Sequence, residues 1–171
     1  MFPSSTKISA TEVVIRAAGP ADIAACRELF VEYQSSLGVS LCFQGFDREV
    51  GGLPGDYTPP RGGLWVAQRG ADAAGCVALR PLDADAAEMK RLYVRPSCRG
   101  KRIGLALAQH AIDAARALGY SVLKLDTLPS MVDAQRMYAH LGFVETAPYN
   151  DNPVNGVRFL AYALRPRIQR A

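Results

Sequence analysis

The stretch from Ala87 to Gly119 places the strongest constraint on how this chain can fold. Its first part, AEMKRLYVRP, nearly alternates polar and apolar residues and predicts a strand. Pro96 helps to end that strand, because proline has no backbone N–H group. A basic turn follows from Arg99 to Gly104, and the segment LALAQHAIDAARALG then predicts a helix that ends at Gly119. The sequence therefore predicts a strand, a turn and a helix in direct succession.

This succession predicts a cradle for an anion. The first N–H groups of a helix have no helical partner, and the helix dipole favours negative charge beside them. Gly100 and Gly104 allow a ligand to approach the backbone closely, and Arg99, Lys101 and Arg102 add positive charge at the mouth. The alternative interpretation is a solvated, basic helix start without a ligand.

The turn RGKRIG, residues 99–104, resembles the pyrophosphate-binding turn of the GNAT superfamily, the acyl-CoA-dependent N-acyltransferases. Residues 92–94 resemble the central strand of that family, and DAQRMYAHLGF, residues 133–143, is similar to its fourth helix and following strand. The order of the elements matches from about Val13 to Leu164. The resemblance implies an α/β (α+β) fold with a mixed, mostly antiparallel sheet, a splayed parallel strand pair and helices on both faces.

The pattern along the chain agrees with that fold. The strand at 87–94 and the strand at 122–126 are joined through a helix, which predicts a parallel pair. A length of 171 residues predicts one domain, with an ordered core at about 12–165. The other predicted strands are 12–17, 63–68, 74–80, 143–146 and 157–164, and the other predicted helices are 20–37, about 47–50 and 131–141.

The resemblance implies acetyl-CoA as the cosubstrate. The amides of residues 100–105 would bind the pyrophosphate, and the pantetheine arm would lie like an added strand beside residues 92–94. The implied cofactor-binding residues are Leu92, Tyr93, Val94, Arg99, Gly100, Lys101, Arg102, Ile103, Gly104, Leu105 and Ala134. Two residues depart from the family pattern: Arg102 stands where glycine is more common, and Met131 stands where an asparagine often contacts the cofactor.

Tyr138 and Glu88 are the candidate catalytic residues. The departing thiolate needs a proton, which the Tyr138 phenol can give, and the acceptor amine must lose one, which Glu88 or water can take. The alternatives are a Tyr138 packed against Phe143 and a Glu88 paired with Lys90 or a nearby arginine. Cys98 lies in the phosphate turn, remote from the expected position of the thioester.

The net charge of +4 and the pI of about 9.0 allow an anionic partner of either kind, a nucleic acid or a phosphorylated cofactor. A nucleic-acid site predicts aromatic residues among the basic ones, and only Tyr93 qualifies, so we expect no nucleic-acid partner. Four cysteines without a CxxC pair and two histidines predict no metal site. The chain shows no membrane-length apolar run and no signal peptide, which predicts a cytoplasmic protein without a membrane partner.

The expected activity is acetyl transfer to a primary amine of a small or amino-acid-like acceptor, by direct attack in a ternary complex. Residues 43–57 and 149–155 would supply the walls of the acceptor pocket. The rival class is a binding module, either a CoA sensor without turnover or another anion-binding protein. The family resemblance also implies that the last strands can pair across subunits in a homodimer.

Overall fold

The computed structural model describes residues 6–8, 13–42 and 45–164. In these residues eight strands form one sheet in the order β1-β2-β3-β4-β5-β6-β8-β7. The strands are β1 (Thr6–Ile8), β2 (Val13–Ala17), β3 (Gly63–Arg69), β4 (Asp72–Pro81), β5 (Ala86–Val94), β6 (Val122–Thr127), β7 (Val144–Glu145) and β8 (Arg158–Ala163). The helices are α1 (Ile23–Leu37), α2 (Phe46–Gly51), α3 (Ile103–Ala117) and α4 (Val132–Leu141), with short 3-10 turns at Pro20–Asp22, Gly55–Tyr57 and Pro96–Cys98.

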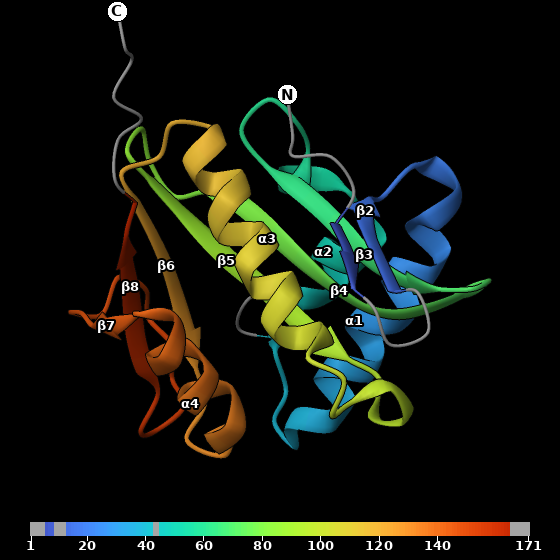
Figure 1. Cartoon of the computed structure of the whole chain (residues 1–171). Coiled ribbons are helices and arrows are strands. Elements are labelled where there is room, and N and C mark those ends of the chain that lie inside the picture. The colour runs from blue at the N-terminus through green and yellow to red at the C-terminus, as the bar shows by residue number, and fades with distance from the viewer. Residues whose placement is uncertain (1–5, 9–12, 43–44, 165–171) are drawn as a thin grey trace, which may run out of the picture.

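One pair of strands is parallel, and it separates along its length. β5 and β6 pair only at Ala86–Val122, Ala87–Leu123 and Glu88–Lys124. Beyond Glu88 the two strands diverge toward the bottom of Figure 1. The other strand pairs of the described residues are antiparallel. The prediction of a mostly antiparallel sheet with a splayed parallel pair is therefore confirmed.

Helices cover both faces of the sheet (Figure 1). α3 packs buried residues such as Leu107 on one face, in a cluster with Trp65 and Leu123. On the other face, α1 and α2 bury Phe30 and Phe46 in a second cluster. The two clusters fix the sheet from both sides, which leaves the diverging ends of β5 and β6 as the place where the layers open. Within the described residues, no helix is long and apolar enough to cross a membrane.

The predicted elements are present, with shifted ends. The helix predicted from residue 20 begins as a 3-10 turn, in which the Asp22 carboxylate accepts from the Gly19 N–H at 2.7 Å. Gly119 takes a φ of +87° just past α3, as expected of a helix-ending glycine. Residue 12, where the first strand was predicted to start, and Phe43, placed in the acceptor wall, lie outside the described residues.

Candidate active site

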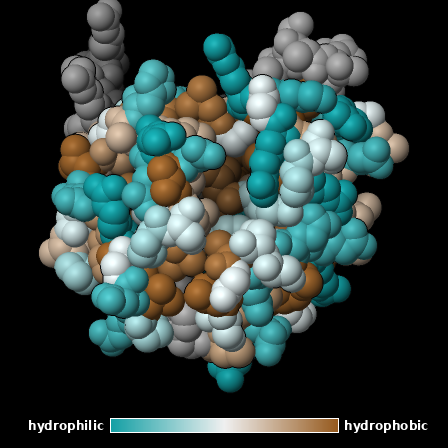
Figure 2. All heavy atoms as spheres, turned by 90° about the horizontal axis from the view of Figure 1, so that it is seen from below, coloured by the Kyte–Doolittle hydropathy of each residue, from teal (hydrophilic) through white to brown (hydrophobic). Residues whose placement is uncertain are grey.

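Two hollows lie where β5 and β6 separate. The inner cavity, about 30 Å³, lies between residues 89–92 of β5 and residues 125–128, at and just beyond the end of β6. The open groove, about 660 Å³, runs past the start of α3 and along α4. Tyr33, Leu37, Leu92 and Met131 line both hollows, so the two are adjacent. Figure 2 looks at this end of the molecule and shows hydrophobic atoms in a hollow near its centre, surrounded by hydrophilic side chains.

The turn before α3 presents its backbone amides without protein acceptors. Counting from the turn, the first backbone amide that makes a helical hydrogen bond is that of Ala106, which donates to the Arg102 carbonyl at 3.1 Å. Within the described part of the chain, none of the six amides of residues 100–105 donates to a protein acceptor. The expected amide cradle is therefore not blocked by the protein's own groups, and it borders the open groove.

Arg102 explains why glycine is the common residue at its position. Its φ of +59° is left-handed, a conformation that costs a residue with a side chain about 1–2 kcal/mol. The substitution therefore keeps the expected backbone geometry at the expense of local strain. Gly100, with a φ of +76°, provides the other left-handed turn without that cost.

The open groove collects nearly all of the residues predicted to bind the cofactor. Of the eleven, ten line it, and Lys101 is the exception. Arg99 folds back onto the end of β5, where its Nε donates to the Val94 carbonyl at 3.0 Å. Met131 and Ser130 also line the groove, at the position of the missing asparagine. Sequence patterns missed the wall from α1, formed by Tyr33, Ser36 and Leu37.

The edge of β5 is open toward the groove. The Arg95 N–H donates to the Ala74 carbonyl of β4 at 2.9 Å. Because backbone groups alternate in direction along a strand, the N–H and carbonyl groups of Val94 and Leu92 point away from β4. β6 has already diverged there, so within the described residues no strand covers this edge.

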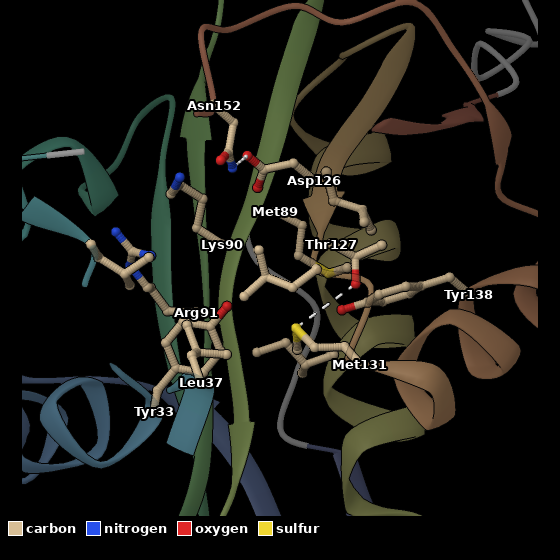
Figure 3. A pocket seen from close by; sticks show the side chains of 14 residues that line it. Tyr33, Leu37, Met89, Lys90, Arg91, Asp126, Thr127, Met131, Tyr138 and Asn152 are labelled. Carbon is tan, nitrogen blue, oxygen red and sulfur yellow. Dashed lines mark hydrogen bonds between the residues drawn. The ribbon is translucent and has the colours of Figure 1, made fainter. Parts of the chain in front are cut away.

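Two phenols point into the inner cavity from opposite walls (Figure 3). Tyr138 comes from α4 and Tyr33 from α1. Burial raises the pKa of Tyr138 well above that of a free phenol, and the nearby Tyr33 adds to the rise. Burial also raises the pKa of Tyr33, to about 12. Both hydroxyls are therefore protonated donors at neutral pH, while the Tyr138 ring packs edge-on against Phe143 at 5.6 Å.

Glu88 lies behind the inner cavity rather than in its wall. Its side chain is fully buried, and its Oε2 accepts from the Arg80 Nε at 2.7 Å. Its Oε1 accepts from the Tyr149 hydroxyl at 3.0 Å and lies 3.7 Å from the Lys90 Nζ. The predicted pairing with Lys90 and a nearby arginine is present. Lys90 does line the cavity, so it stands between Glu88 and the space inside.

Charged groups from distant elements reach the inner cavity, and of these the sequence singled out only Lys90, as a partner of Glu88. Arg91 has a left-handed φ of +56° in a bulge of β5, which directs both Lys90 and Arg91 to the cavity. The Arg91 guanidinium makes hydrogen bonds of 2.9 and 2.6 Å to the two carboxylate oxygens of Glu49 on α2. Asp126 lies at the end of β6, on the other side of the gap.

A parallel strand pair that opens beside a helix start with unused amides defines an acyl-CoA-type acyltransferase fold. Residues 25–143 match the family described as "Acetyltransferase (GNAT) family". The chain is 38% identical over 162 residues to an uncharacterized N-acetyltransferase of Schizosaccharomyces pombe, covering 94% of this chain and 96% of that protein. The chain therefore belongs to the GNAT acetyltransferase family and is an acyltransferase.

Solved structures agree on the fold. A GNAT-family acetyltransferase from Staphylococcus aureus Mu50 superposes with a TM-score of 0.76 at 20% identity, covering 90% of this chain and 99% of that chain. The protein yncA from Salmonella typhimurium, solved with its cofactor acetyl-CoA, has a TM-score of 0.65 at 20% identity and covers 93% and 98%. At these identities the likeness concerns the fold alone.

Proposed function

We propose that this protein transfers the acetyl group of acetyl-CoA to a primary amine of a small or amino-acid-like molecule, by direct attack in a ternary complex. The observation that carries the proposal is the run of six amides at residues 100–105 without protein acceptors among the described residues, beside a groove that leads to the buried phenol of Tyr138 and the half-buried phenol of Tyr33. A related fold that holds acetyl-CoA supports the choice of cosubstrate.

The cosubstrate fits the open groove in two places. The amides of residues 100–105 would hold the pyrophosphate, with Lys101 and Arg102 adding charge near it. The exposed edge of β5 would hold the pantetheine through the backbone groups of Leu92 and Val94, as an added strand would be held. Arg99 must release the Val94 carbonyl for the arm to use that acceptor. The small Ala134 on the facing wall leaves room for the thiol end.

Three groups of this chain would act on the reacting atoms. The Val94 N–H would polarise the thioester carbonyl from the open strand edge. Tyr138, kept protonated by burial, would give its proton to the departing thiolate. Glu88 or water would take the proton of the attacking amine. Because Lys90 lines the cavity and Glu88 does not, the route to Glu88 would run through a water molecule.

Two measurements test the proposal. Calorimetric titration should detect acetyl-CoA binding and no binding of an oligonucleotide at moderate salt. A thiol-release assay across a library of amines should then detect CoA with at least one of them. Binding of acetyl-CoA without thiol release from any amine would favour a CoA sensor, and binding of neither compound would contradict the proposed site.

Water and Glu88 can be separated as the proton acceptor. If Glu88 is the base, Glu88→Gln should lower kcat on the order of 100-fold, whereas a water route should leave kcat nearly unchanged. The variant also leaves Arg80 and Lys90 without their shared carboxylate, so urea unfolding must accompany the kinetics. Glu145→Gln is the control, because Glu145 pairs with Arg158 on the exposed surface.

A further inference from the structure

The inner cavity presents opposite charges from its two strands. In Figure 3, Lys90 of β5 and Asp126 of β6 lie across the cavity from one another, near Asn152. Arg91 also lines the cavity, but its charge is met by the bidentate contact with Glu49. Any molecule that enters therefore meets a cation on one wall, which also pairs with Glu88, and an anion on the other.

Asp126 is held so that one of its oxygens faces a ligand. The side-chain amides of Asn150 and Asn152 both donate to its Oδ2, at 3.2 and 3.1 Å. Its Oδ1 receives no hydrogen bond from the residues that the structure describes. Among those residues, Asp126 is also the one carboxylate in the cavity wall. A carboxylate fixed in this way is suited to bind the ammonium group of an acceptor amine.

Lys90 makes a plain cationic amine an unfavourable occupant. Its side chain is 5% exposed, and its Nζ lies 3.7 Å from Glu88 Oε1. Burial lowers the pKa of Lys90, while the charges of Glu88 and Asp126 oppose that change. A second cation beside this ammonium would be repelled with little screening by water. An acceptor with its own carboxylate removes the conflict, because the negative charge of that carboxylate is attracted to the Lys90 ammonium.

We propose that the acceptor is a small amino acid that binds as a zwitterion, with its ammonium group on Asp126 and its carboxylate on Lys90. This inference rests on the proposed acetyl transfer and names its acceptor class. The cavity of about 30 Å³ is close to the volume of one water molecule, so its walls must open to admit any acceptor, and a compact molecule needs the least opening. Asp126 and Lys90 bind and orient the acceptor, and the proton transfers stay with the groups named above.

The first experiment compares each amino acid with its own carboxamide. The pair shares a side chain and an α-amine, and differs in the carboxylate. We expect the wild-type protein to release CoA with a small amino acid and to prefer it over the carboxamide by about 10–100-fold in kcat/KM, the value of one charged hydrogen-bonded contact. The expected preference is opposite to the intrinsic reactivity of the two amines. The amine of the carboxamide is the weaker base, so a larger fraction of it is unprotonated and able to attack.

Two variants then separate the two contacts. Lys90→Met should lower kcat/KM for the amino acid by about 10–100-fold and leave the carboxamide within about 3-fold. Asp126→Asn should lower kcat/KM for both acceptors by similar factors, because both carry the ammonium group. The matched controls are Lys124→Met, a half-buried lysine outside the cavity, and Asp151→Asn, an exposed aspartate in the loop that holds Asp126. Both controls should behave as wild type.

Titration of each variant with acetyl-CoA serves as a check of folding. A folded variant should bind acetyl-CoA as wild type does, because the open groove is unchanged, whereas a misfolded variant should lose acetyl-CoA binding. If Lys90→Met fails this check, the proposal is still tested by comparing kcat/KM for the amino acid and for its carboxamide in wild type and in Asp126→Asn. Equal use of the carboxamide by wild type, or transfer only to amines without a carboxylate, overturns the zwitterion proposal while acetyl transfer stands. Absence of thiol release with every amine contradicts the proposed function itself.

Discussion

The open groove and the inner cavity are neighbours built on different principles. The groove presents backbone groups: the amides of residues 100–105 and the uncovered edge of β5. The cavity presents side chains from α1, β5, β6, α4 and the loop at Asn152. Backbone donors recognise a diphosphate and a pantetheine whatever the local sequence, whereas side chains define one acceptor. The comparison teaches that the proposed cosubstrate site and the proposed acceptor site occupy separable parts of one gap.

The largest expected effect comes from adding a negative charge to the amide cradle. Gly104→Asp places a carboxylate among the unused amides, where it opposes a bound diphosphate by about 4 kcal/mol at an effective dielectric constant of ~20, or roughly 1000-fold in affinity. Calorimetric titration with acetyl-CoA measures the loss. Gln109→Glu adds the same charge at an exposed position of α3 and should bind nearly as wild type. An unchanged affinity of the Gly104 variant would place the diphosphate elsewhere.

Removing the cavity phenol should affect turnover and spare cosubstrate binding. Tyr138→Phe keeps the packing against Phe143 and removes the proton donor, so kcat should fall on the order of 100-fold with little change in the KM for acetyl-CoA. Tyr162→Phe, next to Phe143 at 5.3 Å, is the control for loss of a hydroxyl in the same aromatic cluster. A larger loss in Tyr33→Phe than in Tyr138→Phe would transfer the role of acid to Tyr33.

A smaller effect tests whether backbone shape outweighs side-chain charge in the groove. Arg102→Gly removes left-handed strain, so its free energy of unfolding should stay constant or rise by less than about 1 kcal/mol. The control is Arg136→Gly at an exposed position of α4, which should lower the free energy of unfolding by about 1 kcal/mol. Affinity of Arg102→Gly for acetyl-CoA should fall no more than about 5-fold. Urea unfolding and titration measure both, and a far larger loss of affinity would make the guanidinium the main ligand.

The smallest effect comes from a residue outside both hollows. Burial lowers the pKa of His110, which packs against Trp65 at 5.3 Å. The unfolded chain therefore binds the proton more readily, and stability from this group is complete above pH 6.5 and falls as the pH drops below it. His110→Leu should reduce the stability lost between pH 7.5 and 5.5, measured by urea unfolding, without changing either hollow. The exposed His140→Leu is the control, and an unchanged acid loss in His110→Leu would refute this assignment.

The groove could be predicted from the sequence because its signals are local. Glycine spacing, a proline after a strand and a basic turn before a helix are visible within residues 87–119, and they predict backbone geometry that the structure confirms. Even the departure at Arg102 was visible, although its left-handed conformation was not.

The cavity could not be predicted in the same way, because it depends on which side chains meet across the sheet. In the sequence alone, Lys90 and Asp126 are ordinary polar positions of two predicted strands, and Tyr33 is an apolar position of a predicted helix. Their meeting depends on the bulge at Arg91 and on the point where β5 and β6 stop pairing, and neither has a sequence signature. Glu88 was predicted as the candidate base, with pairing to Lys90 or an arginine as the alternative. The pairing is present, and the role in proton transfer stays a prediction.

The contact between Arg91 and Glu49 joins the segment before β3 to the strand that carries both hollows. Mutations in α2 can therefore reshape the proposed acceptor side through one guanidinium, while the helix start proposed to bind the diphosphate stays intact. In evolutionary terms, such a chain can exchange one acceptor for another without first giving up its acyl donor.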